Sequence, residues 1–330
     1  MIESLLFSLD GREDLAKKIV RCANSWNKES AQNIDLGYLR SQKFSDGELC
    51  VDFTDSVRGK RVYILSSPNT SDEIIKLELA IDAAKRAAAH EIIVILPYFP
   101  YARQDKKDQS RGPIGAKVMA LKLEALGATS IITYDLHADQ IQGFFQIPVT
   151  HIEGKNVFDD YIYALSASGL TNIILCGPDA GSGKRVKRMK DQLLKKYNVN
   201  LNYVMLDKTR KEANVIDEMV IIGDVRNKDV IILDDMVDTA GTLCKAAEVL
   251  IENGAKSVRA IISHGVLSGP AYNRIDDSML TELIISDSLE SMVMEKIVVF
   301  SVDEQIGMAI AANNLGLSYD ALKSTKKFEL

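Results

Sequence analysis

The stretch from 229 to 243, DVIILDDMVDTAGTL, places two adjacent carboxylates and a small-residue loop directly after an apolar run. In an open parallel sheet, ligands bind beyond the carboxyl ends of the strands, where Asp234 and Asp235 are expected to lie. Paired carboxylates at such a position accept hydrogen bonds from two vicinal sugar hydroxyls, or hold Mg²⁺ through water. The loop 238–242, DTAGT, offers backbone amides and two Thr hydroxyls at the start of the next helix, which suits a phosphate. Together these features predict a site for a ribose phosphate.

The same loop also has a purely structural interpretation. Asp238 and Thr239 belong to residue types that often cap a helix N-terminus. For Asp and Thr alone this interpretation is at least as good as the functional one. The acid pair and the buried strand before the loop favour the binding site.

Short runs rich in Val and Ile alternate with amphipathic helical patterns along the chain, and these elements would position the acids and the loop. Continuous apolar strands that alternate with helices indicate a parallel sheet covered on both faces. We therefore expect an α/β protein. The predicted strands include 62–65, 92–96, 130–135, 172–176, 230–233 and 259–263, and the predicted helices include 72–89, 116–128 and 243–255.

An internal duplication is visible when VRGKRVYILSS at 57–67 is set against VRNKDVIILDD at 225–235, since the Val, Arg, Lys, Val, Ile and Leu positions match without a gap. Several such matches in the same setting indicate two copies of one domain, with a boundary near residue 150. We expect domains over 1–150 and 151–330, with the last helix able to pack back on the N-terminal domain. Ser66 and Ser67 occupy the places of the two aspartates, so the first copy keeps the fold without the acid pair.

The composition bounds the partners and the compartment. A formal net charge of -6 and a pI near 5.4 provide no bulk attraction to nucleic acid or to an anionic membrane, so any anion site must be built locally. The four cysteines lie far apart without a CxxC pair, which is typical of a reducing compartment. The longest apolar runs are strand-sized and the N-terminus lacks a basic leader. We expect a soluble cytoplasmic protein that binds neither nucleic acid nor membrane.

At this point the chain resembles a known family. DDMVDTAGT is similar to the phosphoribosyl diphosphate binding loop of type I phosphoribosyltransferases and of ribose-phosphate pyrophosphokinases. Further motifs resemble those of the pyrophosphokinases in order, over about residues 40 to 275. These motifs are KFSDGE at 43–48, PYFPYARQDKKDQSRGP at 97–113, DLHADQIQGFF at 135–145, GPDAGSGKR at 177–185 and DKTRKEAN at 207–214.

The resemblance implies two tandem phosphoribosyltransferase type I-like domains, each a mainly parallel sheet flanked by helices. The degenerate first domain would contribute to the ATP site, and the second would hold ribose 5-phosphate. The implied activity transfers the pyrophosphoryl group of ATP to O1 of ribose 5-phosphate with Mg²⁺, giving AMP and 5-phosphoribosyl 1-diphosphate for nucleotide biosynthesis. Family members are commonly hexamers, so a homo-oligomer is expected, with ATP sites completed across a subunit interface.

The resemblance also implies roles for individual residues. Lys208 and Arg210 match the catalytic positions, and His137 and Asp179 match the metal-binding positions. The ATP-binding positions are Phe44, Asp46, Glu48, Arg103 and Gln104, and the ribose 5-phosphate positions are Asp234, Asp235, Asp238, Thr239, Ala240, Gly241 and Thr242.

Several alternatives stay open. Phe44 is either a core residue or an aromatic platform for adenine, and 103–111 is either a solvated loop or a lid over the triphosphate. The chain could instead be a phosphoribosyltransferase, or a non-catalytic regulatory subunit of the same family. The C-terminal stretch LGLSYDALKSTKKFEL lacks the SVSYLF-like ending of phosphate-activated members, while Ser56 and Arg58 resemble part of their regulatory site. Allosteric control is therefore left open.

Overall fold

The structure is a computed structural model that describes residues 2–9, 11–26, 33–170, 172–209 and 218–325. It divides into two compact units: unit 1 comprises Met1–Glu153 and Ser301–Leu330, and unit 2 comprises Gly154–Phe300. The expected second domain, 151–330, thus differs from unit 2 at both ends. The larger difference is at the C-terminus, because helix α8 (Asp303–Leu315) packs against helix α1 (Glu13–Trp26) within unit 1.

The core of unit 1 is a six-stranded parallel sheet with the order β2-β1-β5-β6-β7-β8. Strands β5, β6 and β7 coincide with apolar runs that the sequence indicated, whereas β1, β2 and β8 were not among the predicted strands. The side chains from Val62 to Leu65 on β5 have no exposed surface. Burial on both faces is the expected state of parallel strands covered by helices. The bounds are β1 Ser4–Ser8, β2 Ile34–Leu36, β5 Arg61–Leu65, β6 Glu91–Leu96, β7 Ser130–Tyr134 and β8 Val149–Ile152.

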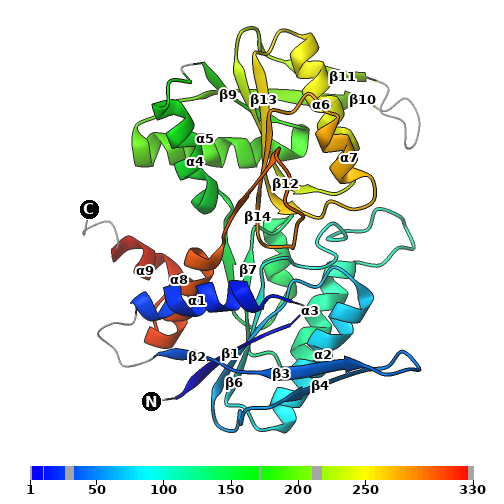
Figure 1. Cartoon of the computed structure of the whole chain (residues 1–330), viewed down its shortest axis with the longest axis vertical. Helices are drawn as coiled ribbons and strands as arrows, with labels where there is room; N and C mark the ends of the chain where they lie inside the picture. Colours follow the sequence, from blue (N-terminus) through cyan, green and yellow to red (C-terminus); the bar gives the residue numbers. More distant parts are fainter. Residues whose placement is uncertain (1, 10, 27–32, 171, 210–217, 326–330) are drawn as a thin grey trace. The chain divides into compact units, whose positions relative to one another are not determined.

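Two pairs of helices accompany this sheet: α2 (Ser71–Arg86) lies beside α3 (Gly115–Leu126), and α1 lies beside α8 (Figure 1). A capping box starts α2, in which the Thr70 hydroxyl accepts from the Glu73 amide. The α1–α8 approach is very close, since a Cβ at Gly307 would lie 2.7 Å from the Cys22 Cβ and 2.9 Å from the Ala23 nitrogen. The short elements α9 (Tyr319–Thr325) and η1 (Asp139–Phe144) complete the described helices of unit 1.

A separate antiparallel hairpin joins β3 (Leu39–Lys43) to β4 (Leu49–Phe53). The β4 strand packs on α2, and the hairpin ends in the turn 44–48 (Figure 1).

The core of unit 2 is a seven-stranded sheet with the order β11-β10-β9-β12-β13-β14-β15, parallel except for the β10–β11 pair. The chain runs from β9 outward to β10 and β11, and then returns to the other side of β9 to form β12. The strand order therefore reverses between β9 and β12, which is where α/β proteins bind ligands. The bounds are β9 Ile173–Gly177, β10 Asn202–Thr209, β11 Glu218–Ile222, β12 Asp229–Val237, β13 Ser257–Gly265, β14 Glu282–Ser286 and β15 Ile297–Phe300.

The helices of unit 2 form two contacting pairs, α4 with α5 and α6 with α7 (Figure 1). Their bounds are α4 Lys155–Ala167, α5 Gly183–Tyr197, α6 Gly241–Glu252 and α7 Ala271–Asp276, with the short η2 at Ala180–Ser182.

The duplicated stretches occupy equivalent places in the two sheets. The match between 57–67 and 225–235 falls on β5 and β12, and each of these strands pairs with the strand from which the order reverses, β1 in unit 1 and β9 in unit 2. The architectures of the two units therefore agree with the duplication and with the predicted α/β fold.

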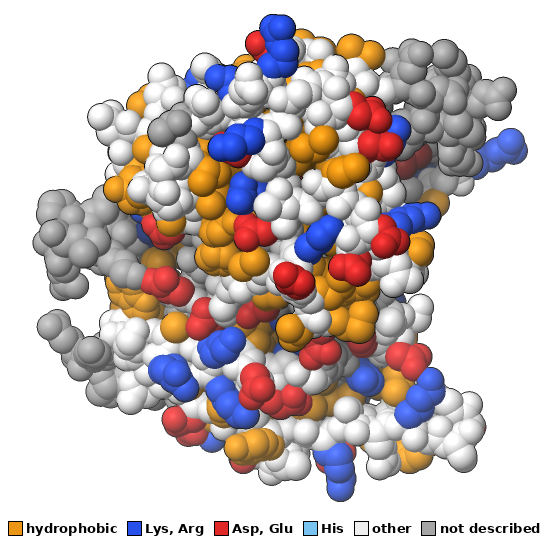
Figure 2. Space-filling model, turned by 45° about the horizontal axis from the view of Figure 1, so that its top comes forward, with side chains coloured by type: hydrophobic (Ala, Val, Ile, Leu, Met, Phe, Trp, Pro, Cys, Tyr) orange, Lys and Arg blue, Asp and Glu red, His pale blue; other side chains and the backbone are white. Residues whose placement is uncertain are grey.

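Basic and acidic side chains are interspersed on the face shown in Figure 2, which accords with the mixed composition. All four cysteines are free thiols. Within the described ranges, none of the helices is both long enough and apolar enough to cross a membrane.

Candidate active site

Asp234 and Asp235 lie inside β12, which continues to Val237, rather than after the strand as the sequence suggested. The neighbouring strand explains why they still face a site. Strand β9 pairs with β12 only as far as the Cys176 and Ile232 pair, so β12 extends beyond it on that side. On the other side β12 stays paired with β13 through Val237. The acid pair is thus held rigidly beside the open end of β9, at the point where the strand order reverses.

Without a ligand, the ionised forms of these two neighbouring carboxyl groups are electrostatically unfavourable. The Asp235 amide donates to Asp234 Oδ1 at 2.9 Å, and Asp235 is only 7% exposed. Burial raises the pKa of Asp234 well above its ordinary value, and the negative charges of Asp235 and then Asp179 raise it further. A ligand that donates hydrogen bonds, or a cation held through water, would relieve this repulsion.

The loop 238–242 leads from β12 into α6 and lacks the cap that the structural interpretation required. The N-cap residue is Ala240, in the left-handed conformation with φ 59° and ψ 0°, and there is no side-chain cap bond. The first main-chain bond of the helix runs from the Cys244 amide to the Ala240 carbonyl at 2.9 Å. The amides of the first turn therefore remain for an anion, at the positive end of the helix dipole.

The Asp238 side chain makes a contact outside the helix, because its Oδ1 accepts a hydrogen bond from the Ser268 hydroxyl. The Ser268 amide also donates to the Asp238 carbonyl at 3.1 Å. Ser268 lies in the turn between β13 and α7, thirty residues away in the chain. Sequence reasoning missed this contact because the pairing of β12 with β13 brings the two loops together.

Asp179 lies at the carboxyl end of β9 and is oriented by its own turn. Its side chain accepts from the Ser182 amide at 3.0 Å, and the Ser182 hydroxyl donates back to the Asp179 carbonyl at 2.5 Å. The preceding strand end is tightly packed, since a Cβ at Gly177 would lie 2.6 Å from both the Met205 Cε and the Ser182 Oγ. Because β9 and β12 are paired neighbours, the negative charge of Asp179 beyond the end of β9 also raises the pKa of Asp234.

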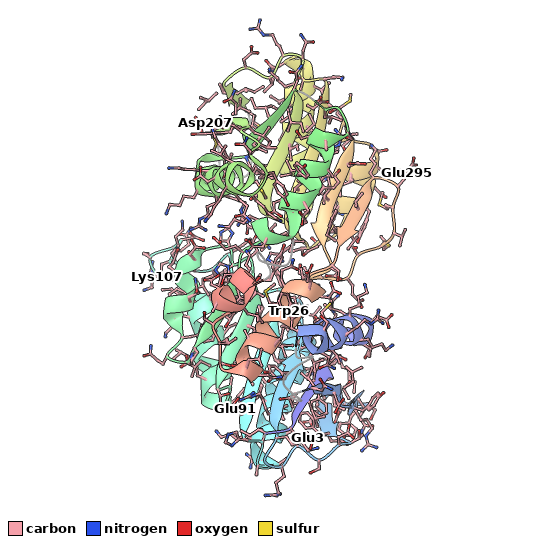
Figure 3. All side chains as sticks on the ribbon, turned by 90° about the vertical axis from the view of Figure 1, so that its left-hand side faces the viewer. Glu3, Trp26, Glu91, Lys107, Asp207 and Glu295 are labelled. Atoms are coloured by element: carbon pink, nitrogen blue, oxygen red, sulfur yellow. The ribbon has the colours of Figure 1, made fainter. Side chains whose placement is uncertain are left out.

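Lys208 and Arg210 were expected in an extended charged segment. Strand β10 runs through Thr209, with Lys208 opposite Met219 on β11, so the backbone is extended up to that point. Figure 3 labels the preceding residue, Asp207, on the same strand. Arg210 and the side chain of Lys208 lie outside the described residues.

The expected ATP residues of unit 1 lie on two kinds of structure. Phe44, Asp46 and Glu48 occupy the β3–β4 turn, where Asp46 Oδ1 accepts from the Glu48 amide at 3.0 Å. Phe44 is 46% exposed, which excludes the core interpretation within this chain.

Arg103, Gln104 and His137 are exposed on the loops that follow the neighbouring strands β6 and β7. Figure 3 shows Lys107, on the first of these loops, at the end of unit 1 opposite Glu3 and Glu91. Gln104 also lines a cavity of about 360 Å³ with Tyr101, Val118 and Met119. His137 and Asp179, the two expected metal positions, belong to different units.

Comparison with known proteins supplies independent information. Residues 4–127 match the family described as the N-terminal domain of ribose phosphate pyrophosphokinase, and residues 187–313 match the phosphoribosyl synthetase-associated domain. The ribose-phosphate pyrophosphokinase of Porphyromonas gingivalis is 46% identical over 277 residues, which cover 83% of this chain and 86% of that protein. The enzyme of the same name from Bacillus cereus is 40% identical over 310 residues, covering 92% of each chain.

A solved structure is similar over almost the whole chain. The crystal structure of phosphoribosylpyrophosphate synthetase from Mycobacterium smegmatis aligns with a TM-score of 0.85 and 32% sequence identity, covering 95% of this chain and all of that one. The expectation of two tandem domains with mainly parallel sheets therefore agrees with both the described architecture and this relative.

Proposed function

This chain belongs to the ribose-phosphate pyrophosphokinase family, and we propose that the end of β12 and the loop 238–242 form its ribose 5-phosphate site. The protein is an enzyme of this family, a transferase of nucleotide biosynthesis. It moves the pyrophosphoryl group of ATP to O1 of ribose 5-phosphate and releases AMP and 5-phosphoribosyl 1-diphosphate.

The sugar end of the substrate fits the acid pair. Two vicinal hydroxyls donate to Asp234 and Asp235, which replaces repulsion between the carboxylates with charge-assisted hydrogen bonds. The observation that carries the proposal is the acid pair, with Asp235 buried and its amide bonded to Asp234 Oδ1, directly before an uncapped helix N-terminus. An acid pair followed at once by unsatisfied amides matches a ligand that has hydroxyls at one end and a phosphate at the other.

The phosphate end of the substrate fits the loop. The amides of 239–242 and the hydroxyls of Thr239 and Thr242 surround the 5-phosphate at the start of α6. The partial positive charge at the N-terminus of α6 attracts this anion, so binding is favoured without any bulk positive charge on the protein.

The reaction joins the sugar O1 to the β-phosphorus of ATP while the bond from that phosphorus to the α-phosphate oxygen breaks. Negative charge builds up on the oxygens around the β-phosphorus, so positioned cations stabilise the transition state. Lys208 and Arg210 are the proposed catalytic cations. Arg103, Gln104, Phe44, Asp46 and Glu48 are the proposed contacts to ATP.

Mg²⁺ is the proposed cofactor, and it would supply electrostatic stabilisation of the phosphate oxygens. Asp179 in unit 2 and His137 in unit 1 are the proposed metal-binding positions. In the described portion of the chain no group of three or more His, Cys, Asp or Glu side chains gathers at one point. A carboxylate such as that of Asp179 supplies the oxygen ligand that Mg²⁺ prefers, and the ion usually takes one or two protein ligands and completes its shell with water and substrate phosphates.

The exposed Phe44 ring supports a further part of the proposal, a homo-oligomer in which a second copy completes the ATP site. A large aromatic side chain at the end of a hairpin exposes apolar surface to water, and the same ring is suited to stacking on a purine base. Phe44→Ala is then expected to raise the KM for ATP without changing the affinity for ribose 5-phosphate.

The activity test uses the purified chain with ribose 5-phosphate, Mg²⁺ and ATP, and measures AMP and phosphoribosyl diphosphate. Formation of both products by this chain alone also excludes the regulatory-subunit alternative, and dependence on ATP excludes a phosphoribosyltransferase. Calorimetric titration with ribose 5-phosphate tests the site itself. Thr242→Val should weaken binding about tenfold by removing one phosphate hydrogen bond, and Thr54→Val in unit 1 is the matched control. Equal affinity of the Thr242 variant and the wild type would refute the assignment.

A further inference from the structure

Arg274 of α7 contacts the main chain of the phosphate loop, at a carbonyl group that the proposed site does not use. Its Nη1 donates to the Thr239 carbonyl oxygen at 2.9 Å. The guanidinium group also lies against Gly241, because a Cβ built at that residue would be 3.2 Å from the same nitrogen. A Cβ at position 241 would push the guanidinium group by a few tenths of an ångström, so the glycine allows the arginine to approach the loop closely.

The arginine projects from a firmly held backbone. The Cys244 thiol on α6 donates to the Arg274 carbonyl at 3.4 Å. The Lys296 ammonium group donates to the carbonyls of Ile275 at 3.3 Å, Asp276 at 2.6 Å and Ser278 at 2.9 Å, which holds the C-terminal end of α7. Arg274 therefore donates its hydrogen bond to the loop from a backbone position that these contacts hold in place.

The contact controls the direction of one peptide group. In a trans peptide the C=O and the N–H point in opposite directions within one plane. Since the Thr239 carbonyl points to Arg274, the Ala240 amide points to the opposite side of this peptide group. In this orientation Ala240 has a left-handed backbone, with φ 59° and ψ 0°, which is unfavourable for a residue that carries a Cβ.

A competing orientation exists because Ala240 is not glycine. Its dihedral angles are close to those of the third residue of a type II turn, where φ is about +80° and ψ about 0°. Rotation of the preceding peptide plane gives the type I geometry, in which φ is about −90° at the same residue. An alanine prefers the type I form, which would turn the Ala240 amide away from the phosphate.

We propose that Arg274 is a positioning residue for the substrate phosphate: it holds the Thr239–Ala240 peptide in the strained orientation whose amide binds the anion. The inference rests on the proposed ribose 5-phosphate site and deepens it. Arg274 acts through the loop and does not touch the substrate, so its positive charge is not what the phosphate recognises.

The test compares substrate affinities of Arg274→Ala with those of Arg226→Ala, which removes an exposed arginine paired with Asp224 in the same unit. Arg274→Ala should weaken ribose 5-phosphate binding about tenfold, because only the fraction of molecules with the competent peptide binds. Its KM for ATP and its melting temperature should remain near those of the wild type and of the Arg226 control.

A second substitution separates positioning from charge. Glycine adopts both signs of φ with similar ease, so Ala240→Gly added to Arg274→Ala should restore ribose 5-phosphate affinity to within about threefold of the wild type. If the double variant binds as weakly as Arg274→Ala, the arginine acts by direct charge and the inference is overturned. Unchanged affinity in Arg274→Ala alone also overturns it. Failure of the wild type to bind ribose 5-phosphate would instead remove the proposed function.

Discussion

Replacement of Asp234 by Asn should stabilise the ligand-free protein at alkaline pH while removing most of its affinity for ribose 5-phosphate. The reason is the raised pKa of Asp234, caused by burial, by Asp235 and by Asp179. The folded protein holds this proton more tightly than the unfolded chain does. Stability contributed by the neutral carboxyl is therefore present below its ordinary pKa of 3.8 and is lost as pH rises through the higher folded value.

The magnitude follows from the repulsion that is removed. Two unit charges about 5 Å apart repel by about 3 kcal/mol at an effective dielectric constant of about 20. An Asn Oδ1 can still accept the Asp235 amide that Asp234 accepts now. We expect the variant to gain about 1 to 3 kcal/mol in free energy of unfolding at about pH 8.5, and much less at about pH 5, where the wild-type carboxyl is protonated. Ribose 5-phosphate affinity should fall by roughly tenfold to a hundredfold, since a charge-assisted hydrogen bond is lost.

Urea denaturation followed by circular dichroism at the two pH values measures the stability difference, and calorimetric titration measures the affinity. Asp224→Asn is the matched control, because that carboxylate is exposed and its hydrogen bonds to Arg226 lower its pKa. The control should show no alkaline gain. If Asp234→Asn destabilises the protein equally at both pH values, or binds the substrate as tightly as the wild type, the electrostatic reasoning is wrong.

Three other substitutions test the supporting structure and the chemistry. Gly177→Ala should lower the free energy of unfolding by about 1 to 3 kcal/mol, because the added methyl group overpacks against Met205 and Ser182. It should also lower turnover, because the turn that holds Asp179 must shift. Unchanged stability in urea denaturation would contradict this packing argument. Tyr63→Phe should lower the free energy of unfolding by about 1 to 3 kcal/mol, since the buried hydroxyl donates to Asn314 at 2.8 Å. Denaturation followed by the fluorescence of the single tryptophan, which lies in unit 1, measures this loss of stability. The KM for ribose 5-phosphate should not change. Lys208→Ala should leave folding intact and lower turnover at least about a hundredfold, or about 2.7 to 4 kcal/mol, and wild-type turnover in the purified variant would refute its assignment.

Several features could be predicted from the sequence because each depends on neighbouring residues. Apolar runs of strand length between amphipathic helices predict parallel sheets, and both units contain them. The match of 57–67 with 225–235 identified two related sheets before their topology was known. The sequence DTAGT after a buried strand predicted backbone amides at a helix start beside two acids, and α6 begins there without a side-chain cap.

Other features depend on residues that are distant in the sequence. Sequence analysis allowed the last helix to pack back on the N-terminal domain, but the contact itself depends on the close fit of Gly307 of α8 against α1, which the local pattern of α8 does not encode. The apolar pattern of 229–237 likewise does not show where β9 stops, although that end point leaves Asp234 beside an open edge. The contact of Ser268 with Asp238 required the parallel pairing of β12 with β13.

The sequence by itself determined which chemical groups are present and in what local order: two carboxylates, a turn of small residues and a helix start. Tertiary structure decided their electrostatic state and their orientation. Burial beside Asp179 raised the pKa of Asp234, and an arginine from α7 set the direction of the peptide before Ala240. The physical reason is that backbone preferences act over a few residues, whereas desolvation, charge repulsion and side-chain contacts depend on which segments the fold brings together.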